Sequence, residues 1–305
     1  MNILGIETSC DDTGVAIVKD GFHIVDSLLS SQDHSITGGV VPDIASRKHM
    51  EVLPLFTCEI IRRNKDIKID KVAVVVNPGL IPSLLVGASF SYGFATGIKV
   101  PIINMNHLLS HIYAPQMQNP SIKYPHISLL VSGGHTQIVK VLSPIKTEII
   151  GTTLDDAAGE AFDKVARMFN LGYPGGPVVS RIAENGDENR INFPRAMDKK
   201  NNYNFSFSGL KTSVLYFIKE NKDNVSKEDI LASFQYAVVD ILVRKTIMVA
   251  RDLHCNTITI SGGVAANKRL REEFLKYNDF EYYFPTIDLC SDNAITVAGL
   301  AYHYE

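Results

Sequence analysis

Two histidines four residues apart, His107 and His111, have a spacing that suggests chemistry in this 305-residue sequence. On a helix these positions lie on one face, so both imidazoles can bind one metal ion. The spacing alone is common, and chance is the other explanation for it. A zinc protease would need a glutamate directly after the first histidine, where Leu108 stands, so a peptidase is disfavoured.

Asp292 is the candidate for a third metal ligand. Two histidines and one carboxylate leave open coordination positions, where phosphate or carboxylate oxygens of a substrate can be bound and polarised. The alternative role for Asp292 is the N-cap of a helix that begins at Ala294. The two roles are geometrically compatible, and both stay open at this point.

Paired glycines follow two apolar segments, in the Ser-Gly-Gly sequences at 132–134 and 261–263. Without a Cβ atom, such turns let backbone N–H groups approach an anionic phosphate. Either turn alone is explained equally well as a tight connection between elements. Their repetition in one chain favours nucleotide binding.

A helix is expected from Asp155, with carboxylates near its start. On this helix Asp163 and Arg167 form an ordinary i,i+4 pair, which is the default interpretation. In the alternative, Asp163 accepts hydrogen bonds from ribose hydroxyls while the loop 172–177 closes over the sugar.

The segment from Arg190 to Lys211 combines basic and aromatic residues. Since the net charge of the chain is −3, any RNA contact needs a local patch of this kind. Phosphate pairing with base stacking is one interpretation. A solvated loop anchored by its aromatics is the other. The residues concerned are Arg190, Phe193, Arg195, Lys199, Lys200, Tyr203, Phe205, Phe207 and Lys211.

Composition is that of a globular protein, with 45% hydrophobic and 21% charged residues. Its length favours two lobes. The four cysteines lack metal-binding or disulfide-framework spacing, which indicates a reducing compartment. The N-terminus resembles neither a signal nor a transit peptide, so we expect a cytoplasmic protein. The uncharged stretch 72–98 contains prolines and a glycine, which favours a buried strand at 72–76 and a buried helix at 83–96 over a membrane span.

Each half of the chain is expected to open with three strands and to continue with helices and a further strand. The first half has strands at 2–8, 14–18 and 22–30, and the second at 127–131, 137–142 and 147–151. This duplication predicts an α/β fold of two lobes, actin-like and sugar-kinase-like with ribonuclease H-like lobes, and a nucleotide cleft between them. The expected N-terminal lobe is 1–108 plus a C-terminal helix at 293–305, and the other lobe is 109–292.

Eight longer motifs span nearly the whole chain. They are GIETSCDDTGVAIV from Gly5, GGVVPDIASRKH from Gly38, LLVSGGHTQIV from Leu129, DDAAGEAFDKVA from Asp155, GYPGGP from Gly172, FSFSGLKT from Phe205, SGGVAANKRLR from Ser261 and LCSDNA from Leu289. In sequence and in order they resemble the motifs of the bacterial and organellar tRNA N6-adenosine threonylcarbamoyltransferases. Single glycine motifs arise by chance, but eight long ones in family order do not.

The resemblance implies transfer of a threonylcarbamoyl group from threonylcarbamoyl-adenylate to N6 of adenosine 37, in tRNAs that read codons beginning with A, with release of AMP. It implies one divalent metal, iron or alternatively zinc, bound by His107, His111 and Asp292. Asp11 would orient or deprotonate the attacking amine, although a turn-forming aspartate is the simpler role. The adenylate would be bound by Leu130, Val131, Ser132, Gly133, Gly134, Asp163, Gly176, Ser180 and Asn267.

The partners implied are the tRNA anticodon loop, an inactive paralogous subunit, a small P-loop ATPase and a second copy of the chain, with no membrane. One departure concerns the metal: the family's H-x-E-G-H has Leu109 and Ser110 in place of its glutamate and glycine, so a carboxylate near the ligands is missing. Two other function classes remain, an actin-like ATPase or small-molecule kinase, and a non-catalytic scaffold. Retention of all three metal ligands argues against the scaffold.

Overall fold

The computed structural model describes residues 1–34, 37–196, 202–221 and 224–304, which form two compact units. The first unit comprises Met1–Ser121 and Ile287–Glu305, and the second comprises Ile122–Thr286. The boundaries therefore differ from the expected 108/109 and 292/293. The reason is that helix α3 (His107–Gln118) packs on β5 (Ile102–Asn106) and α9 (Ala294–Ala301) of the first unit.

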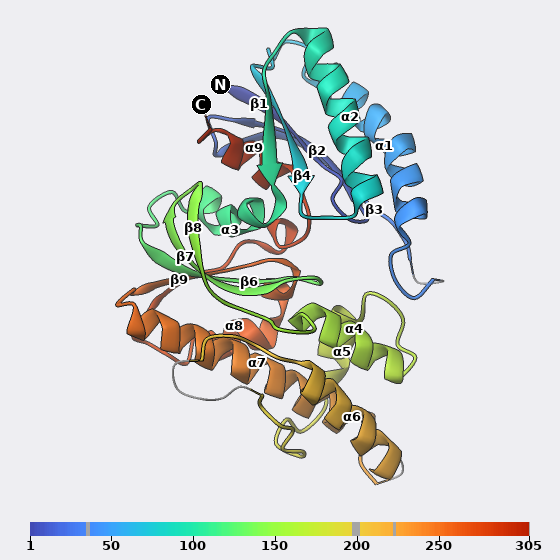
Figure 1. The fold of residues 1–305 in the computed structure, drawn as a ribbon, viewed down its shortest axis with the longest axis vertical. Coiled ribbons are helices and arrows are strands. Elements are labelled where there is room, and N and C mark those ends of the chain that lie inside the picture. Colours follow the sequence, from blue (N-terminus) through green and yellow to red (C-terminus); the bar gives the residue numbers. More distant parts are fainter. Residues whose placement is uncertain (35–36, 197–201, 222–223, 305) are drawn as a thin grey trace. The chain divides into compact units, whose positions relative to one another are not determined.

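A five-stranded sheet forms the first unit, in the order β3-β2-β1-β4-β5 (Figure 1). β1 (Asn2–Glu7), β2 (Asp12–Lys19) and β3 (His23–Ser31) are antiparallel, whereas β4 (Lys71–Asn77) and β5 run parallel to β1. Alternate residues of the strands face opposite sides. One side packs on α1 (Pro42–Arg63) and α2 (Ile81–Ile98), and the other on α3 and α9.

The second unit repeats this sheet, in the order β10-β9-β6-β7-β8. Its strands are β6 (His126–Val131), β7 (Thr136–Ser143), β8 (Lys146–Thr152), β9 (Thr257–Ser261) and β10 (Glu281–Tyr283). Its helices are α4 (Ala158–Met168), α5 (Gly175–Ala183), α6 (Ser208–Asn221), α7 (Lys227–Asp252) and α8 (Lys268–Phe274), with the short 3-10 helix Gly263–Ala266 after β9. In both sheets an antiparallel meander continues into two parallel strands, so the expected duplication is confirmed.

The helix expected from Asp155 begins at Ala158. Asp155 is used elsewhere: its carboxylate accepts hydrogen bonds from the backbone N–H of Phe207 at 2.8 Å and from the Ser208 hydroxyl at 2.7 Å. The Asp156 carboxylate binds Lys211 at 2.9 Å. Both aspartates thus tie the start of α6 to the start of α4, a tertiary role that replaces the expected capping.

Helix α2 differs from the fully buried helix that was expected. Its buried residues are small and spaced by four, at Ser83, Gly87, Ser91 and Ala95. Gly87 is needed there, since a Cβ would collide with the Thr8 side chain. Several larger apolar side chains of the helix, such as Ile81 and Leu85, are therefore exposed. Among the described residues α2 is also the one helix long and apolar enough to cross a bilayer, a criterion that core helices of soluble proteins also meet.

Candidate functional site

His107, His111 and Asp292 converge in the first unit, with their ligand atoms all within 4.8 Å of one another. The Oδ1 atom of Asp292 lies 3.0 Å from His111 Nε2 and 3.6 Å from His107 Nε2. His111 is buried and Asp292 is partly exposed. The arrangement fits one metal ion, because the Nε2 atoms of both histidines lie near one carboxylate oxygen of a partly exposed aspartate.

Local capping explains how the chain places these ligands. Strand β5 passes directly into α3, and the Asn106 side chain accepts a hydrogen bond from Leu109 N at 3.0 Å, so His107 is the first helical residue. At the other element, α9 is capped by Asn293, whose side chain accepts from Thr296 N at 2.9 Å. The capping role considered for Asp292 is therefore wrong, because its neighbour fills it.

Carboxylates surround the three ligands. Burial is the main cause that raises the pKa of Asp12 to about 7, and the nearby charges of Asp292, Asp11 and Glu7 raise it further. Burial alone lowers the pKa of His107, but the charges of Asp292 and Glu7 more than offset it and raise that pKa to about 9. A positive charge is thus favoured between these carboxylates, and a divalent cation supplies one.

Asp11, the candidate for orienting the attacking amine, lies in the turn between β1 and β2. It is partly exposed and accepts a hydrogen bond from the thiol of Cys10, whose pKa is raised first by burial and then by Asp11 and Asp292. The neutral form of the thiol is therefore favoured, which argues against Cys10 as a nucleophile. Asp11 thus lies in the same group of acidic side chains as Asp292, the candidate metal ligand.

The two Ser-Gly-Gly turns are neighbours in the second unit, because β6 and β9 are adjacent parallel strands whose carboxyl ends carry them. Leu130 and Val131 are fully buried strand residues, so they position the first turn. Gly133 and Gly134 are exposed, and a Cβ at either would meet no atom within 4 Å. The fold does not require glycine at these two positions, and the missing side chains leave the backbone open to close approach by a ligand.

Asp163 contacts the glycine loop. Its Oδ1 accepts a hydrogen bond from Gly175 N at 2.7 Å, and Gly176 N also donates to this carboxylate. Burial raises the pKa of Asp163, and these two donors act in the opposite direction. The carboxylate therefore holds the start of α5 against α4. A Cβ on Gly176 would meet open space, so its backbone is accessible.

Ser180 and Asn267 are joined to each other and to a third residue that sequence reasoning missed. Gln235 on α7 accepts hydrogen bonds through Oε1 from Ser180 Oγ at 2.8 Å and from Asn267 Nδ2 at 2.9 Å. Gln235 is buried in the middle of a long helix. Its neighbours Phe234 and Ala237 are apolar, so a glutamine at a buried position was the signal available in the sequence.

The phenylalanines of the basic and aromatic segment do not form a stacking surface. Phe193, Phe205 and Phe207 are buried in the second unit. Arg195 bonds Asp240 at 3.1 Å, and Lys211 is paired with Asp156. Lys199 and Lys200 lie outside the described residues. The interpretation as anchors to the core is correct for these three phenylalanines, which cannot stack on bases, whereas Tyr203 is partly exposed and donates to Asp252 at 2.9 Å.

Solved structures of other proteins share the fold. Component A of the Acidaminococcus fermentans (R)-2-hydroxyglutaryl-CoA dehydratase matches with a TM-score of 0.58 at 16% identity, over 99% of this chain and 98% of that one. HypF from T. kodakarensis matches with a TM-score of 0.66 at 14% identity, over 99% of this chain and 47% of that one. These likenesses confirm the actin-like α/β class and, at such identities, show the fold alone.

Sequence relatives are much closer. A protein of Thermosipho africanus named tRNA N6-adenosine threonylcarbamoyltransferase is 50% identical over 99% of this chain and 94% of its own length. One of the same name from Borrelia garinii is 45% identical over 99% of this chain and 91% of its own length. The alternative function as an ATPase or small-molecule kinase is therefore not favoured.

The model of one protein family also matches, over residues 23–299, and its description is tRNA N6-adenosine threonylcarbamoyltransferase. This match covers most of both units. It agrees with the near full-length relatives and with the eight ordered motifs. The chain belongs to the tRNA N6-adenosine threonylcarbamoyltransferase family, and is accordingly a transferase whose substrate is tRNA.

Proposed function

We propose that the chain transfers the threonylcarbamoyl group of threonylcarbamoyl-adenylate to N6 of adenosine 37, with one divalent metal at His107, His111 and Asp292. The observation that carries the metal assignment is the convergence of three ligand atoms in one unit, within 4.8 Å. The surrounding carboxylates add support, because they favour a cation between them. Iron is the proposed ion, with zinc as the alternative.

The reaction is acyl transfer. The N6 nitrogen forms a bond to the carbamoyl carbon, the bond from that carbon to the phosphate oxygen breaks, AMP leaves, and N6 loses one proton. A bound metal would supply Lewis-acid polarisation of carbamoyl and phosphate oxygens. Asp11 is suited to orient the amine and to accept its proton, because it is partly exposed and belongs to the same acidic group as Asp292.

The second unit is proposed to bind the adenylate. Backbone N–H groups at Gly133 and Gly134 are open to a ligand, and such groups stabilise the negative charge of a phosphate. The space beside Gly176 is open too, although its N–H is bound to Asp163. Ser180 and Asn267 present oxygens that accept hydrogen bonds, which suits the hydroxyl and amino groups of a nucleoside. Asp163 holds the glycine loop in place. AMP, the leaving group, contains both a phosphate and a nucleoside.

The test combines elemental analysis with a transfer assay in the complete modification system. Purified protein should carry about one iron or zinc per chain, and modified nucleoside should appear in the supplied tRNA by mass spectrometry. His107→Ala should lose the metal and at least about a hundredfold in activity. The matched control is His23→Ala, an exposed histidine of the same unit, which should lose neither. Full activity of metal-free His107→Ala protein would refute the metal assignment.

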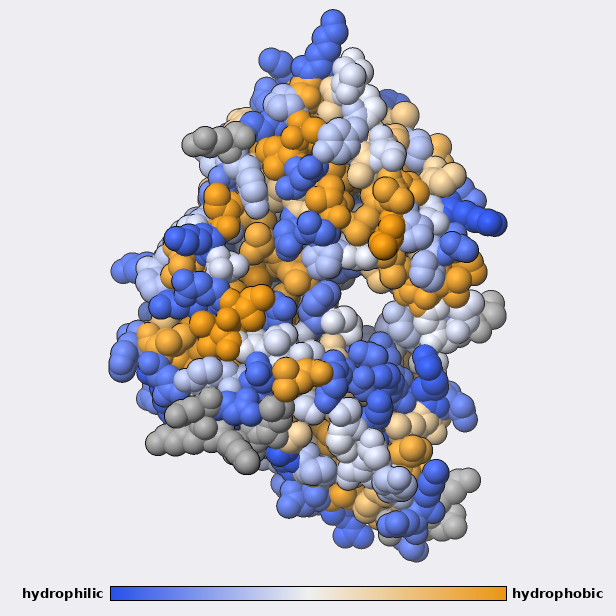
Figure 2. All heavy atoms as spheres, viewed as in Figure 1, coloured by the Kyte–Doolittle hydropathy of each residue, from blue (hydrophilic) through white to orange (hydrophobic). Residues whose placement is uncertain are grey.

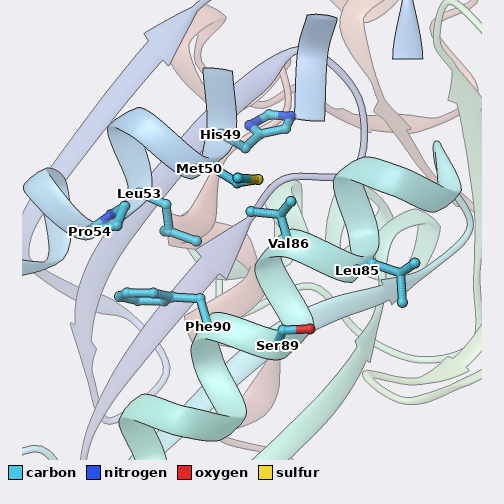
Figure 3. Close-up of a pocket in the computed structure, with 8 residues that line it drawn as sticks. All are labelled: His49, Met50, Leu53, Pro54, Leu85, Val86, Ser89 and Phe90. Carbon is cyan, nitrogen blue, oxygen red and sulfur yellow. The ribbon is translucent and has the colours of Figure 1, made fainter. Parts of the chain in front are cut away.

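A face of the first unit supports the proposed protein partners. Between α1 and α2 lies a hollow of about 430 Å³, lined by His49, Met50, Leu53, Pro54, Leu85, Val86, Ser89 and Phe90. Figure 3 shows Leu53, Val86 and Phe90 directed into the space between the helices. Apolar residues also gather on the surface over α1 and α2, in the upper part of Figure 2. Exposed examples are Leu85 at 60% and Ile81 at 72%.

We assign this face to the inactive paralogous subunit, because a paralogue of the same fold carries an equivalent helix pair and two such pairs pack together. A second copy of the chain is the competing occupant. The small P-loop ATPase is proposed to join the same assembly. A cytoplasmic location is proposed with it, since the described cysteines Cys10, Cys58, Cys255 and Cys290 form no disulfide, as in a reducing compartment.

A further inference from the structure

Glu7 is a buried carboxylate at the end of β1, with 1% of its surface exposed. Its Oε1 accepts a hydrogen bond from Ser9 N at 2.6 Å, and its Oε2 lies 3.0 Å from His107 Nδ1. A buried carboxylate is costly unless it is paired. The His107 ring is the side chain that pairs with Glu7, so the two residues belong to the same site.

This contact determines which nitrogen of His107 is left for a metal. A carboxylate accepts hydrogen bonds and does not donate them when ionised, so Nδ1 carries the proton and donates it to Glu7. In the neutral ring Nε2 then has the free lone pair, and Nε2 is the atom that lies 3.6 Å from Asp292 Oδ1. Metal-binding histidines are commonly oriented by a carboxylate in this way.

The other histidine has no equivalent support. His111 Nδ1 is buried and makes no hydrogen bond to any described residue. Nor does the segment between the ligands supply a carboxylate. Leu109 packs against the apolar core that α3 and α9 share with the sheet. The Ser110 hydroxyl donates to Asn106 O at 3.1 Å.

We propose that Glu7 is a positioning residue for the metal: it fixes the tautomer and ring orientation of His107, and thereby provides from β1 a carboxylate that Leu109 and Ser110 do not provide from α3. The proposal rests on the proposed metal function. Ser9 Oγ, at 3.1 Å from the same Nδ1, is the competing partner. The carboxylate is the stronger acceptor, because a charge-assisted hydrogen bond is roughly twice as strong as a neutral one.

The experiment measures the affinity of the full chain for Co²⁺ and Zn²⁺ by competition with a chelator, together with the visible absorption of bound Co²⁺. Glu7→Gln keeps the shape of the side chain and removes its charge, and should weaken metal binding by about 10- to 100-fold. Ser9→Ala should change it less than about threefold. The matched control is Thr13→Val, which removes the hydroxyl 2.8 Å from Nδ1 of another buried histidine, His49, in the same unit. It should leave metal affinity unchanged.

Wild-type affinity in a folded Glu7→Gln protein, or a larger loss in Ser9→Ala than in Glu7→Gln, would overturn the proposal. If Glu7→Gln does not fold, the ¹⁵N shifts of labelled histidine in the wild-type zinc complex decide: a proton on His107 Nδ1 supports the proposal, and a proton on Nε2 refutes it. Failure of the metal assignment itself would look different from failure of the Glu7 proposal. Wild-type and His107→Ala proteins would then bind metal equally poorly.

Discussion

Asn267 donates a hydrogen bond from Nδ2 to Ser180 Oγ at 2.7 Å, linking two residues that are 87 positions apart. The second proton of Nδ2 is donated to Gln235 Oε1, and Oδ1 accepts from Leu270 N at 3.0 Å to cap α8. Because Ser180 also donates to Gln235, its hydroxyl proton is not available to a ligand. The remaining capacity of Ser180 and Asn267 is to accept hydrogen bonds, so their ligand should offer donors.

Replacing Gln235 with methionine should weaken AMP binding to the full chain about tenfold. The substitution removes the acceptor shared by Ser180 and Asn267, and a buried donor left without a partner costs about 1–3 kcal/mol. Isothermal titration with AMP measures the effect. Ser233→Ala is the matched control, because it removes a buried hydroxyl two residues earlier on the same helix. Equal AMP affinity in Gln235→Met and wild type would contradict the role of this network.

The glycines of the second unit should separate into two groups when replaced by alanine. Gly133→Ala should change the free energy of unfolding by less than about 0.5 kcal/mol, since its Cβ meets no atom within 4 Å. The same Cβ would occupy space next to the backbone N–H groups, so AMP affinity should fall about tenfold. Denaturant unfolding and calorimetric titration measure the two quantities.

Gly159→Ala is the counterpart and should lower the stability of the fold. A Cβ at Gly159 would lie 2.6 Å from Ser132 O, a backbone atom that cannot move without disturbing the first glycine turn. Overpacking of this kind costs about 1–3 kcal/mol of stability. Stable Gly159→Ala protein, or unaltered AMP affinity in Gly133→Ala, would show that this division of the glycines is wrong.

Local sequence patterns predicted most of the fold because apolar periodicity marks strands and helices wherever one face is buried. They failed where tertiary contacts determine the presence or the limits of an element. Strand β5 was missed, since its sequence IINMN alternates weakly and is only five residues long. Helix α4 begins three residues later than predicted, because Asp155 and Asp156 are bound to α6.

The candidate site was predictable to a different extent. Histidine spacing and the glycine pairs pointed to His107, His111 and the turn at 132–134 by chemistry alone. Glu7 and Gln235 had no such local sign. Each acts on a residue at least 32 positions away, so only the fold brings them to their partners. A buried polar residue in an apolar strand or helix was the one clue that the sequence contained.

His126 makes the stability of the second unit depend on pH. Burial lowers the pKa of this histidine from 6.5 to about 4, and its hydrogen bond to Lys123 O offsets only part of that. Below pH 6.5 the unfolded chain binds a proton that the folded chain does not. Stability should therefore fall as the pH drops from 6.5 to 4, by about 3 kcal/mol for this group.

Unfolding by urea at a series of pH values measures that dependence. His126→Phe keeps an aromatic ring beside Tyr124, whose ring centroid is 5.3 Å away, and should show a shallower decline between pH 6.5 and 4. His23→Phe, at an exposed position of the other unit, should retain the wild-type slope. An identical slope in His126→Phe would mean that other groups cause the acid sensitivity.

Leu85→Arg should disrupt association with the paralogous subunit, because the exposed side chain lies on the apolar face of α2. A charge placed in the centre of a helical interface costs at least about 2 kcal/mol, which is roughly a 30-fold increase in Kd. Sedimentation of the two purified proteins measures it. Leu154→Arg is a closely matched control, since this second-unit leucine is also 60% exposed. Unchanged binding in Leu85→Arg would refute the assignment, and loss of self-association alone would assign the face to a second copy of the chain.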